Sequence, residues 1–367
     1  MENLFNGIYA NKKVLITGHT GFKGSWLALW LTKLGAQVIG LSKDVPTQPA
    51  HFDMLGLSME SVMGNINETG LLEKLIDQHQ PDIIFHLAAQ PIVRLSYQNP
   101  IETFETNVLG TVKLLDACRK SNSLKALVNI TTDKCYENRE WVWGYRENDT
   151  LGGYDPYSAS KACSEIVTSA YRNSFFSEKK GNKSMLIASA RAGNVIGGGD
   201  WAPYRLIPDI IRATANKENV IIRNPDSTRP WQHVLEPLSG YLLLGQKLLE
   251  NQNQFAQAWN FGPACYKDSL TVQQVVATMK NYWDKVEFTI QIDHNQPHEA
   301  SLLTLDCSKA LTKLKWQPIW SLDTTFQKTM IWYKNYYENH IVNSESDLSD
   351  YIIDAKNKNA SWTKTIS

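Results

Sequence analysis

Tyr157 and Lys161 carry the clearest chemistry in the chain, within the run D-P-Y-S-A-S-K. Asp155 can cap a helix and Pro156 fits its first turn, so the two side chains, four apart, share one helix face. A phenol titrates near ~10, and a lysine cation beside it favours the phenolate. The pair can then take a proton from a hydroxyl while hydride leaves the same carbon. Because Tyr and Lys often share an exposed face by chance, the pattern is informative only downstream of a dinucleotide fingerprint.

A second polar group, Thr132, Asp133 and Lys134, directly follows an apolar run. Thr132 can hydrogen-bond a substrate hydroxyl, while Asp133 and Lys134 bring an acid and a base to the same strand end. Two such titratable groups exceed what the oxidation of an alcohol requires. The alternative is a turn with a solvated Asp–Lys pair.

Hydride transfer needs an acceptor, and residues 13–26, K-V-L-I-T-G-H-T-G-F-K-G-S-W, predict where it binds. An apolar strand is followed by Gly18, Gly21 and Gly24 and then by apolar residues at helical spacing. The glycines let the backbone approach a pyrophosphate, and free N–H groups at the helix start hold its charge. The alternative is an ordinary glycine-rich turn. The residues expected to bind the cofactor are Gly18, Thr20, Gly21, Phe22, Lys23, Gly24, Asp44, Asn65, Ile66, Leu87, Ala88, Ala89, Gln90, Asn107, Tyr157, Lys161 and Arg191.

Within that set, Asp44 stands about twenty positions past the glycines, where an acid holds the ribose hydroxyls of NAD. Lys43 leaves a 2′-phosphate open as an alternative. Asn65 is expected at the adenine, and Asn107 is expected to brace the site through its amide.

The elements that position these groups alternate along the first half of the chain. We expect strands at 37–41, 83–87, 126–131 and 185–190 and helices at 71–79, 103–120 and 156–173, which predicts an α/β fold with a doubly wound parallel sheet. Ligands bind at the carboxyl ends of such strands. We expect an NAD-binding Rossmann domain at 1–195, with a return segment at about 231–262 in which residues 231–249 are helical.

The second half, 196–367, is predicted to form a smaller substrate-binding domain that ends, from about Asp347, in a loosely held polar tail. Arg229 is suited to clamp a diphosphate, although a surface salt bridge is the alternative. His294 and His298 are separated by Pro297 and lack a third ligand, so no metal site is predicted. The residues expected to bind the substrate are Arg94, Asn194, Arg229, Trp231, Asn260 and His298.

Composition excludes several classes of protein. Among 367 residues, 37 acidic and 37 basic side chains balance, so we expect no nucleic-acid or membrane partner. Five cysteines without a C-x-x-C pair favour reduced thiols and a cytoplasmic location. No signal peptide is expected from M-E-N-L-F-N-G, and no apolar run approaches the ~18 residues of a membrane span.

Several motifs resemble a known family. The runs G-H-T-G-F-K-G-S-W, T-D-K-C-Y and Y-S-A-S-K resemble extended short-chain dehydrogenases/reductases. Longer runs resemble the CDP-glucose 4,6-dehydratases within that family, over nearly the whole chain to about Tyr336. These are H-L-A-A-Q-P-I-V-R-L-S-Y, W-G-Y-R-E-N, R-A-G-N-V-I-G-G-G-D-W, R-P-W-Q-H-V-L-E-P-L-S-G-Y, W-N-F-G-P and P-H-E-A.

The resemblance implies tightly held NAD, CDP-glucose as substrate, a CDP-4-keto-6-deoxyglucose product for deoxysugar biosynthesis, and a homodimer built from helices near 103–120 and 156–173. It carries over Thr132, Asp133, Lys134, Tyr157 and Lys161 as the catalytic set. Related dTDP-glucose dehydratases place Glu where this chain has Lys134, which leaves the base at carbon 5 open. An epimerase or reductase on the same scaffold, or a non-catalytic NAD sensor, remains an alternative.

Overall fold

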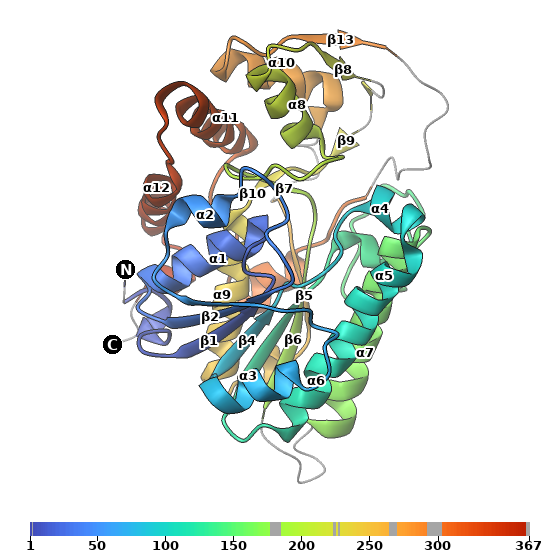
Figure 1. The fold of residues 1–367 in the computed structure, drawn as a ribbon, viewed down its shortest axis with the longest axis vertical. Coiled ribbons are helices and arrows are strands. Elements are labelled where there is room, and N and C mark those ends of the chain that lie inside the picture. The colour runs from blue at the N-terminus through green and yellow to red at the C-terminus, as the bar shows by residue number, and fades with distance from the viewer. Residues whose placement is uncertain are drawn as a thin grey trace.

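A single parallel sheet forms the centre of the protein (Figure 1). The structure, a computed structural model, describes residues 1, 3–176, 185–222, 225–226, 228–263, 270–291 and 303–364. Seven described strands pair in parallel throughout. Their spatial order is β11 (Ala258–Phe261), β6 (Leu186–Ala192), β5 (Ala126–Ile130), β4 (Ile83–His86), β1 (Lys13–Thr17), β2 (Gln37–Ser42) and β3 (Glu60–Met63). The predicted doubly wound parallel sheet is confirmed.

Helices cover both faces of this sheet (Figure 1). One face packs against α1 (Phe22–Lys33) and α9 (Leu235–Leu249), and the other against α3 (Leu71–His79), α6 (Gly110–Lys120) and α7 (Pro156–Phe175). The residues of α1 from Gly24 to Leu31 are all buried. A helix that is apolar all round must be covered on its outer side as well, and C-terminal elements provide that cover.

Two predicted helices have different bounds in the structure. The predicted helix at 103–120 is divided into α5 (Pro100–Phe104), a π-helical turn η2 (Glu105–Leu109) and α6. The predicted helical segment that starts at 231 begins instead with the strand β10 (Gln232–His233), because these residues pair with β7 (Val195–Ile196).

A second lobe lies beyond the carboxyl ends of the strands (Figure 1). It has its own hydrophobic cluster, which includes Trp201, Ile210, Met279 and Trp332. The expected domain boundary at 195/196 stays a prediction. The elements of this lobe are α8 (Leu206–Ala215), α10 (Val272–Tyr282), α11 (Leu322–Asn339), and the strand pairs β8 (Val220–Ile222) with β13 (Phe288–Ile290) and β9 (Thr228–Arg229) with β12 (Leu270–Thr271).

The expectation of a loosely held tail from about Asp347 is wrong. Helix α12 (Ser344–Asn357) buries Leu348, Tyr351 and Ile352, whose helical spacing the many polar neighbours conceal in the sequence. Trp362, in η8 (Ser361–Thr363), stacks on Phe5 with ring centroids 5.1 Å apart. The C-terminal segment is therefore part of the main core.

The remaining short elements are η1 (Leu4–Gly7), α2 (His51–Leu55), α4 (Val93–Gln98), η3 (Asp133–Cys135), η5 (Asn253–Phe255) and η7 (Ala310–Leu314). Within the described ranges, no helix has both the length and the apolar character that crossing a bilayer requires.

Candidate active site

A cavity of about 810 Å³ opens where the carboxyl ends of the strands meet the second lobe. Its wall combines residues that follow β1, β2, β4 and β5 with residues of the second lobe such as Arg205 and Trp231. Most residues predicted from the sequence line it. They are Gly18, Thr20, Gly21, Phe22, Lys23, Gly24, Asp44, Asn65, Ile66, Leu87, Ala88, Ala89, Gln90, Arg94, Thr132, Lys134, Tyr157, Lys161, Asn194 and Trp231.

Steric crowding requires glycine at two positions of the turn after β1. Gly18 has a φ of +80°, and a Cβ there would lie 2.8 Å from the Ala88 nitrogen. A Cβ on Gly24 would lie 2.0 Å from the Gly18 carbonyl oxygen, so α1 can pack this closely on the turn only without a side chain. The first N–H groups of α1 have no acceptor within the helix and can bind an anion.

At the end of β2, the neighbours of Asp44 favour a ribose over a 2′-phosphate. The Thr20 hydroxyl donates to the Asp44 carbonyl oxygen at 2.7 Å, which fixes this segment beside the glycine turn. Lys43, the alternative phosphate ligand, instead forms an ion pair with Glu102 at 2.9 Å.

Tyr157 and Lys161 both lie on the first two turns of α7 and face the cavity. Asp155 caps this helix by accepting a hydrogen bond from the Ser158 N–H at 2.9 Å, and Pro156 occupies its first turn. Burial raises the pKa of Tyr157 to about 12, although a hydrogen bond shared with Thr132 lowers it. Burial lowers the pKa of Lys161 to about 8, against the attraction of Glu165. Lys161 therefore still carries most of its charge at neutral pH.

The η3 turn brings the second polar group to the same edge of the cavity. Thr132 caps the turn, and its hydroxyl donates to the Asp133 carboxylate at 2.9 Å. The Lys134 ammonium lies 3.8 Å from the same carboxylate. Asp133 is 3% exposed and is not part of the cavity wall, so it acts on the cavity from behind Thr132 and Lys134.

Arg205 is a functional candidate that sequence reasoning missed. It lines the cavity from the second lobe and donates to the Asp200 carboxylate at 2.8 Å. Its charge also acts on Tyr157, where it lowers the phenol pKa. The run G-G-G-D-W-A-P-Y-R contains both partners, but only the fold shows that this loop turns toward α7.

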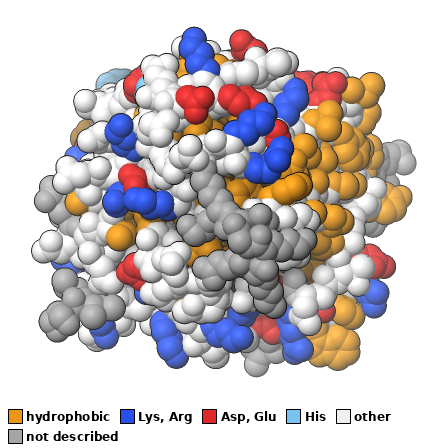
Figure 2. All heavy atoms as spheres, turned by 90° about the horizontal axis from the view of Figure 1, so that it is seen from below, with side chains coloured by type: hydrophobic (Ala, Val, Ile, Leu, Met, Phe, Trp, Pro, Cys, Tyr) orange, Lys and Arg blue, Asp and Glu red, His pale blue; other side chains and the backbone are white. Residues whose placement is uncertain are grey.

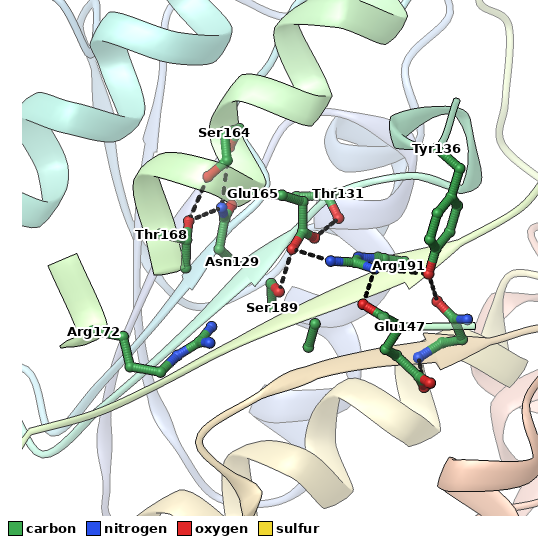
Figure 3. Close-up of polar contacts among 12 residues, drawn as sticks. Asn129, Thr131, Tyr136, Glu147, Ser164, Glu165, Thr168, Arg172, Ser189 and Arg191 are labelled. Carbon is green, nitrogen blue, oxygen red and sulfur yellow. Dashed lines mark hydrogen bonds and ion pairs between the residues drawn. The ribbon is translucent and has the colours of Figure 1, made fainter. Parts of the chain in front are cut away.

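Besides Asp133, three further predicted residues lie outside the cavity wall. Asn107 accepts from the Gln90 N–H at 2.8 Å and donates to the Gln90 carbonyl at 3.1 Å, so it holds the wall from behind. Arg191 is 3% exposed and forms an ion pair with Glu165 at 2.8 Å (Figure 3). Asn260 is fully buried and accepts from the Tyr136 hydroxyl at 2.7 Å.

Strand register explains the position of the last two residues. Arg191 and Asn260 are paired neighbours in β6 and β11, and both lie before the ends of their strands. The residues that reach the cavity from β6 are Ala192 and, just beyond it, Gly193 and Asn194. The structure places both side chains inside the fold, and the assignment of Arg191 to the cofactor and of Asn260 to the substrate stays a prediction.

Two substrate predictions are not settled by the structure. The backbone of Arg229 belongs to β9, but its side chain lies outside what the structure describes, as do His294 and His298. Among the described residues, no group of three His, Cys, Asp or Glu side chains is placed to hold a metal ion.

Comparison with known proteins gives a consistent result. Residues 15–329 match the family described as GDP-mannose 4,6 dehydratase. A CDP-glucose 4,6-dehydratase from Salmonella typhimurium is 52% identical over 349 residues, which cover 94% of this chain and 97% of that protein. A dTDP-D-glucose 4,6-dehydratase from Dictyostelium discoideum is 26% identical and covers 92% of this chain and 86% of its own.

Solved structures share the fold at lower identity. An epimerase from Methanothermobacter thermautotrophicus has a TM-score of 0.78 at 23% identity, with 90% of this chain and 94% of that chain covered. The dTDP-glucose 4,6-dehydratase of Bacillus anthracis, in complex with NAD, has a TM-score of 0.73 at 21% identity, with 89% and 98% covered.

Proposed function

The chain belongs to the GDP-mannose 4,6 dehydratase family, and we propose that it is an NAD-dependent lyase that converts CDP-glucose to CDP-4-keto-6-deoxyglucose. The relative that is 52% identical over nearly the whole chain supports the choice of substrate. The observation that carries the chemistry is the meeting of Tyr157 and Lys161 with the Thr132 to Lys134 turn at one edge of one cavity.

The residues at the glycine turn fit a dinucleotide. Gly18 and Gly24 let the turn pack closely against Ala88 and α1, and the start of α1 offers N–H groups to a pyrophosphate at the cavity wall. Asp44 would hold the adenosine ribose, and Asn65 and Ile66 the adenine, beside the Lys43–Glu102 pair that disfavours a 2′-phosphate. Bound there, NAD would supply hydride transfer between carbon 4 and carbon 6 of the sugar and, in its oxidised form, a positive charge.

The protein's own groups move the protons. Tyr157 takes the proton of the C4 hydroxyl, with Lys161 as the neighbouring cation that makes its phenolate accessible. The resulting C4 ketone acidifies the C5 proton, which Lys134 removes. Asp133 and Lys134 hold one proton between them: it is on Asp133 while neutral Lys134 takes the C5 proton, so Asp133 releases it through Thr132 to the departing C6 hydroxyl, and the proton gained by Lys134 restores the ion pair. A proton returned to C5 completes the 4-keto-6-deoxy sugar.

A panel of nucleotide-activated sugars tests this proposal. The purified protein is incubated separately with CDP-, dTDP-, UDP- and GDP-glucose, and each reaction is scored for 4-keto-6-deoxy sugar by NMR. We expect product from CDP-glucose well ahead of the other three. Product from another nucleotide alone would overturn the substrate assignment, and no keto-sugar from any of them would overturn the reaction.

We further propose a homodimer formed through the helices near 103–120 (α5, η2 and α6) and 156–173 (α7). Ile101, Phe104, Leu109 and Ile166 are exposed apolar side chains on these elements. Figure 2 has a broad hydrophobic strip on the side where α5 and α7 lie in Figure 1. Apolar patches of this kind commonly mark contact surfaces. The cytoplasmic location stays a prediction from the cysteine pattern.

A further inference from the structure

Glu165 is a buried carboxylate on α7, one turn beyond Lys161, that the proposed reaction does not use. It is 3% exposed, and both of its oxygens have partners (Figure 3). Oε1 accepts from the Thr131 hydroxyl at 2.5 Å, and Oε2 accepts from Ser189 at 2.7 Å and from Arg191 at 2.8 Å. Burial opposes its charge, but Arg191 and these hydrogen bonds lower its pKa overall. Glu165 is therefore ionised beneath the active site.

The partners of Glu165 join the strands that end at the cavity. Thr131 directly precedes the Thr132 to Lys134 turn after β5, while Ser189 and Arg191 lie two apart on one face of β6. Arg191 continues the network by donating to the Tyr136 hydroxyl at 2.7 Å and to the Glu147 carbonyl at 3.1 Å. The carboxylate thus holds in one arrangement the helix that carries Tyr157 and the strand end that carries Asp133.

The negative charge of Glu165 also raises the pKa of Lys161, against the effect of burial. The Lys161 ammonium is buried and donates to the Ile130 carbonyl at 3.3 Å. From β4, His86 faces it as a neutral ring, because burial lowers the pKa of His86 to about 3. From η3, Cys135 keeps its proton, because burial raises the pKa of that thiol. From α1, Lys23 adds repulsion.

Around Glu165 itself, the facing charges are Arg191 on β6 and Arg172 on α7. Arg191 pairs directly with the carboxylate, whereas the Arg172 guanidinium donates to the Ile187 carbonyl at 2.8 Å.

We propose that Glu165 is a positioning residue, which keeps Lys161 in its cationic form and holds the Thr131 end of β5 in register with α7. The inference rests on the proposed function, because the need for a Lys161 cation comes from the role given to Tyr157. Arg191 acts in the same sense, because its charge lowers the pKa of Glu165 and keeps that carboxylate ionised.

The test uses two variants that remove the anion near Lys161 in different ways. Glu165→Gln removes the anion itself, so Lys161 should lose its proton at lower pH and the alkaline limb of the kcat profile should move down by about 1 pH unit. Arg191→Met removes the cation that keeps Glu165 ionised, so burial raises the pKa of Glu165 and the limb should also move down. A residue that only stabilises the fold would give losses of activity without a shift of the limb. Glu165→Asp keeps the charge and should restore the limb toward its original pH.

A second readout does not depend on turnover. The rate at which Lys161 is acetylated at each pH, read by mass spectrometry of the peptide that contains it, measures how readily its ammonium loses a proton. We expect the acetylation profile of Glu165→Gln to lie about 1 pH unit below that of the unaltered protein. Ser189→Ala removes one hydrogen bond but no charge, and should leave the profile in place.

Each outcome decides the proposal. An unchanged Lys161 profile in Glu165→Gln, or an upward shift of the limb in Arg191→Met, would overturn it. If Glu165→Gln does not fold, the direction of the Arg191→Met shift and the Ser189→Ala control still decide. A protein that makes no keto-sugar but shows the expected acetylation shift would refute the proposed function while leaving the coupling of Glu165 to Lys161 intact.

Discussion

At the scale of single residues, Tyr157 is the group on which the proton chemistry depends. Its phenol has a pKa of about 12 because it is buried, so it becomes a useful base only through the positive charges around it. Tyr157→Phe removes the base but keeps the ring, and we expect a folded protein whose kcat is lower by at least ~10²-fold.

The control for this variant is Tyr154→Phe, three positions earlier on an exposed side chain outside the cavity wall. It should turn over normally, as measured by keto-sugar formation under saturating CDP-glucose. Near-normal turnover by Tyr157→Phe would remove Tyr157 from the mechanism.

A site residue could be predicted from the sequence where local spacing alone fixes its position, and not where pairing with distant residues fixes it. Helical spacing alone was enough to predict that Tyr157 and Lys161 lie together. A strand before the glycines and a helix after them were enough to predict the cofactor turn. Arg191 and Asn260 follow strands in the same way, but their depth below the sheet edge depends on pairing between β6 and β11, which no local pattern encodes. Arg205 was missed because a loop of the second lobe brings it to α7.

At the scale of elements, the close approach of α1 to the turn after β1 explains why Gly24 tolerates no side chain. A Cβ there would lie 2.0 Å from a backbone oxygen that cannot move freely. We expect Gly24→Ala to lower the free energy of unfolding by about 3 kcal/mol, the upper end of typical overpacking costs, and to weaken NAD binding. Gly21→Ala is the matched control.

A Cβ on Gly21 would meet the Gly18 oxygen at an ordinary 3.4 Å, and the φ of Gly21 is −70°. Chemical unfolding should therefore leave Gly21→Ala close to the unaltered protein. Equal stability of the two alanine variants would contradict the steric account of the turn.

The polar composition of the C-terminal segment led to the wrong prediction of a loose tail where the structure has the helix α12. Many polar residues in 344–357 concealed one apolar stripe, whose Tyr351 contacts Trp30 of α1 and Trp320, both distant in the sequence. We expect Trp362→Ala to cost about 3–5 kcal/mol, because it removes a fully enclosed ring from the main core.

Ile353, on the exposed side of α12, provides the comparison. Ile353→Ala should change the free energy of unfolding by less than about 0.5 kcal/mol, as is usual for surface positions. If urea unfolding shows that Trp362→Ala costs no more than Ile353→Ala, the segment is not part of the core.

At the scale of the whole molecule, the doubly wound parallel sheet followed from the alternation of strands and helices, but the assembly did not. The proposed dimer predicts that Ile166→Glu, which places a charge in the strip on α7, converts the protein to a monomer. Ile353→Glu, which is equally exposed at 54% but lies on α12, should leave the dimer intact. Light scattering during gel filtration distinguishes the two states, and an unaltered protein that is monomeric would contradict the proposed interface.

In the proposed reaction, the two lobes enclose a single cavity in which hydride moves from carbon 4 to carbon 6 of the same sugar. The most direct measurement supplies CDP-glucose deuterated at carbon 4 and locates the label in the product by NMR and mass spectrometry. We predict deuterium at carbon 6 of the 4-keto-6-deoxy sugar, without loss. Deuterium returned to carbon 4 of a hexose, or released in free NADH, would contradict the account.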